Sequence, residues 1–405
     1  MAFMDWLLLI LPIALLVVMF RPRIRNSRFW LATVTPLASI IGSGFLVIAP
    51  LLGVTVGDQA PWAMLAIVVA AYVIGAIIRF NIRHAEVLLE SASRTDILFL
   101  SERGSNIALS AAYVISVAFY LRLLAAFVLR GFGIQSEFAA NATTTGVLLF
   151  IGSVGWWRGL RGLERLEEYS VTIKLAIIAA LLLGLGHFDI IHGFGNGGLK
   201  GQLGSPWQTA CVLGGMLLVV QGFETSRYLG AEYSADMRIK SMRVAQILAG
   251  CIYLAFAVLI TPLLHSIDST LPNETAIIDL AGHASMLLPA MLVIAAVMSQ
   301  FSAAVADTVG AGGLLEEETG HRITTHVAYP LIAFCAIILI WNSHIFHMIA
   351  FASRTFAAYY FLQALVAFQV TLRCPDLYHR RAWQLMFGIV MLGLAWIVVF
   401  AKSVV

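Results

Sequence analysis

Apolar runs close to the length of a membrane span recur along this 405-residue chain from one end to the other. An α-helix needs about 20 predominantly apolar residues to cross the hydrocarbon core of a bilayer. Of the residues, 60% are hydrophobic and 12% are charged, whereas about a quarter of the residues in a soluble domain are charged. The pattern predicts one all-α polytopic membrane domain embedded in the lipid bilayer.

The runs predict about 12 transmembrane helices, and the basic loops between them fall on alternate connections. The predicted spans are 4–20, 30–53, 60–80, 106–132, 141–157, 168–186, 208–230, 243–264, 286–313, 325–341, 345–370 and 382–401. The basic loops are 21–28, 79–103, 158–165, 227–243 and 373–381. Because loops rich in Lys and Arg remain in the cytoplasm, we expect these loops inside and both chain ends outside.

Two connections carry features of their own. Residues 81–90 mix charged and apolar side chains at helical spacing, which predicts a helix that lies on the inner membrane surface. The connection 187–207 is rich in glycine, but no strand precedes it and no helix follows in the way that a phosphate-binding loop requires. We expect it to join two halves of the protein on the outer side.

Composition and motifs argue against several other classes of protein. The net charge of +3 lies in short loops, so it reports membrane topology and indicates no nucleic-acid partner. The chain has no His-Glu-x-x-His, Gly-x-Ser-x-Gly or Cys-x-x-Cys pattern, and these patterns carry metal-dependent, serine and redox chemistry. We therefore expect no enzyme, no cofactor and no metal site, in a multi-pass protein of the bacterial inner membrane.

Two of the spans are interrupted by glycine. The first contains Gly42-Ser43-Gly44, and the second contains Gly214-Gly215 followed by Gln221-Gly222. Glycine is unfavourable inside a helix, and non-helical backbone at bilayer depth is tolerated only where it is buried in protein or lines a cavity. The alternative is a face of small residues where helices pack closely. Paired interruptions favour a binding site made of main chain.

The two interrupted spans divide the chain into halves of similar length. Each begins a set of five spans, in residues 29–186 and 208–371, and the connection 187–207 joins them. Because five is odd, the second set enters the membrane from the opposite face, as an inverted repeat requires. Residues 1–28 would then add a helix and a basic loop before the repeats, and residues 372–405 a loop and a helix after them.

Short motifs in this arrangement resemble those of the amino acid-polyamine-organocation (APC) superfamily of transporters. The glycine motif of its first helix is similar to Ile41-Gly42-Ser43-Gly44-Phe45, and its sixth-helix motif is similar to Gly222-Phe223-Glu224 with Ala231-Glu232. Its fifth helix resembles Tyr169 to Leu175, and its eighth helix and following loop resemble Ser302 to Asp307 with Thr319-Gly320-His321. The resemblance implies a LeuT-type 5+5 inverted repeat with discontinuous first and sixth core helices. The additional N-terminal helix, Asp307 and the acidic run 316–318 depart from the family pattern.

Main-chain groups at the interruptions are the candidate substrate ligands. Amide N–H groups at a helix start attract a carboxylate, and carbonyl groups at a helix end accept hydrogen bonds from an ammonium group. Phe223 is suited to close over the ligand, although a core aromatic is equally compatible with the sequence. The predicted substrate-binding residues are Ser39, Ile40, Gly42, Ser43, Gly44, Gln221, Gly222 and Phe223.

Three charged side chains are candidates for coupling transport to protons, because a charge inside a membrane span is costly and usually functional. They are Lys174, Glu224 and Asp307. Lys174 could instead extend to the membrane interface, and Glu224 could cap the broken helix. In the resembled family a lysine at the position of Lys174 replaces a sodium ion, which implies proton coupling or exchange.

Three further side chains of the span 106–132, namely Tyr113, Tyr120 and Arg122, leave alternatives open. Asp307 could form an ion pair with Lys174 or with Arg122. Tyr113 and Tyr120 are seven residues apart, so they share one face of their helix and either line a cavity or pack in the core.

These features predict a secondary transporter that moves an amino acid or a related small amine or zwitterion by alternating access. The coupling would use protons, by symport, or exchange (antiport). The alternatives are a non-transporting membrane sensor and a channel-like protein, because both can be built from the same interrupted helices.

Overall fold

The computed structural model describes residues 2–160, 166–193, 199, 201, 205–266 and 273–403, and it describes the backbone alone of residues 2–5, 43, 166–168 and 218. The predicted basic loop 158–165 and the connection 187–207 lie partly outside these residues. Every regular element within them is a helix.

Nine helices of the described chain are long and apolar enough to cross a membrane. They are α5 (Ala60–Phe80, continued by η1, Asn81–Ala85, and α6, Glu86–Ser91), α7 (Ile97–Gly131), α8 (Glu137–Arg158), α10 (Leu166–His192), α12 (Ala235–Ile260), α14 (Leu288–Glu318), α15 (Thr325–Asn342), α16 (Ile345–Arg373) and α17 (Arg380–Phe400). The chain therefore has the architecture of a polytopic membrane protein.

Helices also stand at the three other predicted spans. The N-terminal span is α1 (Ala2–Met19), and α2 (Pro22–Arg25) follows it. Both glycine-containing spans are interrupted, as the sequence predicts. The first consists of α3 (Arg28–Gly44) and α4 (Ile48–Val56), and the second of α11 (Pro206–Gly214), η2 (Leu217–Val220) and η3 (Phe223–Leu229). The remaining short elements are η4 (Thr261–Ser266) and α13 (Ala276–Ala284).

The interruption of the first span lies three residues later than the sequence predicts. Gly42 and Gly44 belong to the last turn of α3, and the non-helical backbone is Phe45–Val47. Gly44 allows the two segments to approach closely and does not unwind the helix, because a Cβ at this position would lie 2.7 Å from the Cα of Val219. The prediction that Gly42 and Gly44 form the turn itself is therefore wrong.

The predicted surface helix at 81–90 also needs correction. Helix α5 continues without a break through the π-helical η1 into α6. The side chain of Asn81 is fully buried, and its amide donates to the backbone oxygen and to Oε1 of Gln363 in α16, at 2.8 Å each. A buried amide needs partners, so the segment packs against α16 at Asn81, while Arg83 and Val87 are exposed. It is the continuation of a spanning helix and not a separate surface helix.

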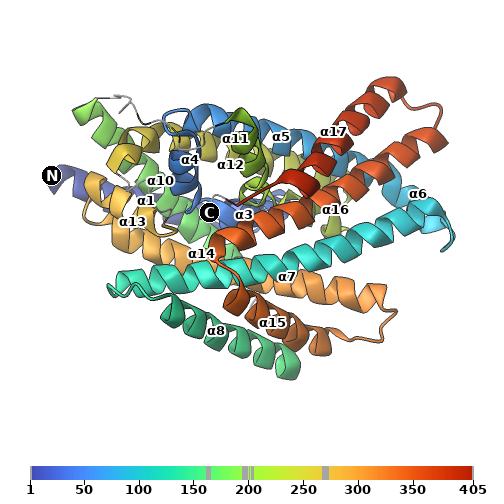
Figure 1. The fold of residues 1–405 in the computed structure, drawn as a ribbon, viewed down its shortest axis with the longest axis horizontal. Helices are drawn as coiled ribbons and strands as arrows, with labels where there is room; N and C mark the ends of the chain where they lie inside the picture. Colours follow the sequence, from blue (N-terminus) through green and yellow to red (C-terminus); the bar gives the residue numbers. More distant parts are fainter. Residues whose placement is uncertain are drawn as a thin grey trace.

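Helix α7 runs through the middle of the molecule and contacts α14, α16, α8 and α15 (Figure 1). Helices α8 and α15 pack on each other at one edge, while α17 packs on α16 at the opposite edge. Most of α7 is buried, whereas little of α17 is buried. The interrupted α3 lies within this arrangement, where α10, α12, α14 and the broken second segment contact it.

Buried ion pairs join η3 to its neighbours at the end of the molecule that holds α6. Arg227 Nη2 lies 3.0 Å from Glu102 Oε1 in α7, and Arg238 Nη2 lies 2.6 Å from Glu86 Oε2 in α6. Arg238 also donates to the backbone oxygen of Arg227 at 2.7 Å. Both guanidinium groups are buried, so the broken segment is tied to two rigid helices at its predicted cytoplasmic end.

Candidate functional site

The two interrupted segments cross each other in van der Waals contact. Gly44 lies against Val219, and a side chain on Gly222 would collide with Ser39 and with the backbone nitrogen of Ile40. Along the first segment the contacts run from Ser39 to Gly44, and along the second they run back from Gly222 to Val219. The two segments are therefore antiparallel. The crossing brings the predicted residues Ser39, Ile40, Gly44 and Gly222 together.

Gly222 adopts a backbone conformation that favours glycine, with φ +118° and ψ −14°. This conformation turns the chain out of η2 and directs the Gly222 amide to Glu224, whose Oε2 accepts it at 2.9 Å. The hydroxyl of Tyr360 in α16 donates to the same oxygen at 2.7 Å. Glu224 is fully buried, and its Oε1 makes no hydrogen bond with the described residues. Glu224 thus caps the broken helix, one of its two predicted roles, and still has a free acceptor.

Side chains from two helices, α10 and α14, donate to carbonyl groups in the C-terminal half of α3. Lys174 Nζ in α10 donates to the backbone oxygen of Ala38 at 2.7 Å and to Ser299 Oγ at 3.3 Å. Gln300 Nε2 in α14 donates to the backbone oxygen of Gly42 at 2.9 Å. The Gly42 carbonyl belongs to the last turn of α3, where carbonyl groups lack partners within the helix, so the hydrogen bond from Gln300 stabilises the interruption. Lys174 is buried, which excludes its extension to the membrane interface in this conformation.

Tyr253 in α12 joins the two segments directly. Its hydroxyl lies 3.0 Å from the backbone oxygen of Ile40 and 2.7 Å from that of Val219. Tyr253, Gln300 and Tyr360 are not among the site residues predicted from the sequence. Each is a polar side chain in an apolar span, which is the signal that could have found them, although their partners lie far away in the sequence.

Aromatic side chains surround the Glu224 end of the site. Phe223 stacks on Tyr360 with ring centroids 5.2 Å apart. The Tyr120 hydroxyl accepts a hydrogen bond from Gln221 Nε2 at 2.9 Å, and Tyr113 packs edge-on against Phe356. Tyr120 is therefore directed to the broken second segment, whereas Tyr113 packs against α16 and against Gly310 of α14, and both rings are buried.

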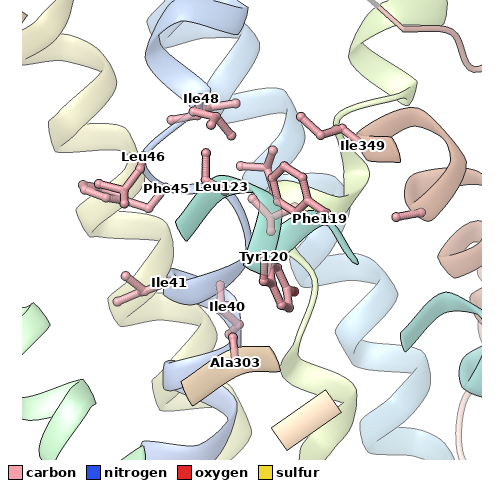
Figure 2. Packing of buried hydrophobic residues seen from close by; sticks show 14 of the residues in the cluster. Ile40, Ile41, Phe45, Leu46, Ile48, Phe119, Tyr120, Leu123, Ala303 and Ile349 are labelled. Atoms are coloured by element: carbon pink, nitrogen blue, oxygen red, sulfur yellow. The ribbon is translucent and has the colours of Figure 1, made fainter. Parts of the chain in front are cut away.

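Apolar side chains fill the space around the first interruption. Figure 2 shows Phe45, Leu46 and Ile48 of this segment with Phe119 and Leu123 of α7 nearby. The cavity described next to the crossing, between Ile40, Val220 and Tyr253, has a volume of only about 20 Å³. The crossing is therefore closed in this conformation.

The remaining predicted residues have separate positions. The Ser43 side chain lies outside the described residues, and Asp307 is buried in α14. Arg122 does not pair with Asp307. Its Nη1 lies 3.6 Å from Glu274 Oε1, and its Nε donates to Asn141 Oδ1 at 2.8 Å. Helix α7 directs Arg122 away from the crossing, because Tyr120, two residues earlier, faces the crossing.

The fold and the site together define a multi-pass helical membrane protein organised around two interrupted helices. A sequence model of the APC superfamily transporter family matches residues 22–401. An uncharacterized protein of Aquifex aeolicus (strain VF5) is 44% identical over 406 residues, which cover 99% of this chain and 97% of that relative. The chain belongs to the APC superfamily of transporters.

Proposed function

We propose that this protein is a secondary transporter that moves an amino acid or a related small amine or zwitterion by alternating access. The repeats would be 29–186 and 208–371, joined by 187–207, with 1–28 and 372–405 as additions. The antiparallel crossing of α3 with the broken second segment supports the inverted relation. The contacts between helices do so as well, because α5 packs on α12, α7 on α14 and α8 on α15, and these are the counterparts in the two predicted halves.

The surroundings of Glu224 carry the proposal for the substrate class. A buried carboxylate whose described partners are the neutral Tyr360 hydroxyl and the Gly222 amide attracts a cation, and aromatic rings add attraction for an ammonium group. Phe223 and Tyr360 supply such rings beside it. The substrate would therefore carry an ammonium group at this end of the crossing.

The other substrate ligands would come from the crossing itself. Ser39, Ile40 and Gln221 would offer carbonyl groups, and Gly42, Ser43 and Gly44 would offer amides to a carboxylate. Since Gly42 and Gly44 are helical in this conformation, the carboxylate role requires the last turn of α3 to open. A wild-type affinity in a Gly44→Leu variant would exclude this role.

Lys174 is the proposed coupling residue. A protonated ammonium group makes charge-assisted hydrogen bonds to the Ala38 carbonyl and to Ser299 Oγ, and these are stronger than bonds from a neutral amine, so loss of the proton would weaken the hold of α10 and α14 on α3. Glu224 and Asp307 are further candidates to carry the proton. This arrangement favours proton symport or exchange. The bacterial source of the Aquifex relative supports a bacterial inner membrane as the location.

The test is uptake of labelled amino acids and amines into proteoliposomes with an inward proton gradient, an inward sodium gradient or neither. We expect proton-stimulated accumulation that Lys174→Ala abolishes, while Lys240→Ala, at an exposed position, leaves it intact. Unchanged pH dependence in the Lys174 variant would refute the coupling role. If no compound accumulates but one raises the melting temperature, the protein is a sensor; gradient-independent ion flux would indicate a channel.

A further inference from the structure

A cavity of about 530 Å³ lies at the end of the molecule that the basic loops place outside. This volume falls within the range of about 300–1,000 Å³ that is usual for small-molecule sites. Its walls come from the C-terminal half of α7, the N-terminus of α8, residues 273–275 and α13. The cavity is large enough to hold a ligand the size of an amino acid.

The cavity is separate from the crossing of the interrupted helices. Arg122, Ala126 and Leu129 line it from α7, whereas Tyr120 bonds Gln221 at the crossing. Residues 120 and 122 are two positions apart, which corresponds to about 200° around an α-helix. The two sites therefore lie on opposite faces of α7.

Arg122 is the decisive side chain in this cavity. It is 5% exposed, and its Nη1 has no hydrogen-bond partner among the residues that the structure describes. The nearest carboxylate oxygen, Glu274 Oε1, is 3.6 Å away, beyond hydrogen-bond distance. By contrast, Arg130 in the same cavity donates to both oxygens of Asp279, at 2.6 and 2.8 Å. Arg130 is therefore paired with a carboxylate of the protein, whereas Arg122 keeps a donor for a ligand.

We propose that this cavity binds a small carboxylate, whose oxygens take the place of Glu274 on Arg122. An arginine guanidinium presents paired donors that match the two oxygens of a carboxylate, and the 3.6 Å separation shows that Glu274 does not use them fully. Glu137 lines the same cavity, so a ligand that also carries an ammonium group gains a second contact. The preferred ligand is therefore a zwitterion.

Competition between the ligand and Glu274 for Arg122 can be tested by thermal unfolding with small ligands. Glycine, acetate and methylamine are added to the detergent-purified protein at equal ionic strength, and the melting temperature is followed. Glycine should raise it most, acetate less and methylamine least. Arg122→Gln should weaken the apparent affinity for glycine at least tenfold, whereas Glu274→Gln should strengthen it, because the internal competitor is gone.

A variant at the crossing of the interrupted helices, the central site, distinguishes ligand binding beside Arg122 from ligand binding at the proposed transport site. Phe223→Ala should retain the glycine and acetate shifts if the ligand binds beside Arg122. If Phe223→Ala removes them while Arg122→Gln keeps them, the outer site is refuted and the central site stands. Equal shifts with sodium chloride would also overturn the proposal. Should Arg122→Gln fail to fold, Glu274→Gln decides, because unchanged or weaker binding in that variant contradicts the competition.

Discussion

Gly222 offers a sensitive test of the crossing between the interrupted helices. Its φ of +118° would cost an alanine roughly 1–3 kcal/mol in backbone strain. A Cβ would also lie 2.6 Å from Ser39 Cβ and 2.7 Å from the Ile40 nitrogen, and such overpacking typically costs about 1–3 kcal/mol. Alanine restricts the unfolded chain, which returns about 0.4–1 kcal/mol. Gly222→Ala should therefore destabilise the protein by about 3 kcal/mol.

The matched control is Gly313→Ala in α14, where no neighbouring atom lies within 4 Å of the added carbon. An alanine there should be neutral or stabilise by up to about 1 kcal/mol. Thermal unfolding of both variants in the same detergent, with ligand binding measured alongside, compares the two positions. Gly222→Ala should lower the melting temperature and the affinity together. If the two variants melt alike, the close approach of Gly222 to α3 is refuted.

Two further predictions concern ion pairs at the opposite end of the molecule from the outer cavity. Glu102→Gln should destabilise the protein by about 3–5 kcal/mol, because it leaves the buried charge of Arg227 without its carboxylate, whereas Asp236→Asn at an exposed pair should cost less than about 1 kcal/mol; equal losses in thermal unfolding would contradict this. The Arg373 guanidinium and the Leu98 amide lower the pKa of Asp96 from 3.8 to about 2, so Asp96 stabilises the folded state above about pH 4 and loses this effect as the pH falls toward 2. Asp96→Asn should flatten the melting temperature between these pH values, and an unchanged acid profile would rule the linkage out.

The sequence predicts the positions of the helices well because apolar runs of spanning length have few alternatives in a membrane. The two interruptions were also predictable, since glycine pairs recur in corresponding spans. The residues at which the helices break were less predictable. Gly44 serves close contact with Val219, and glycine has the same sequence signature whether it opens a turn or admits a neighbouring chain.

Pairing between distant side chains could not be predicted in the same way. Arg122 was one of two candidate partners for Asp307, but the structure pairs it with Glu274 and Asn141. Helix phase alone does not identify which polar group another helix will present at the same depth. For the same reason, Tyr253 and Gln300 remained hidden among apolar neighbours until the helices were assembled.

The position of Tyr253 has a consequence for how the crossing can move. A phenol carries one proton, yet its oxygen lies within 3.0 Å of carbonyl groups on both interrupted segments. The proton can serve only one of them at any moment. If the segments slide apart, Tyr253 can stay with either one and still donate one bond. Tyr253 can therefore keep one hydrogen bond throughout such a motion, so it does not hold the two segments in a single relative position.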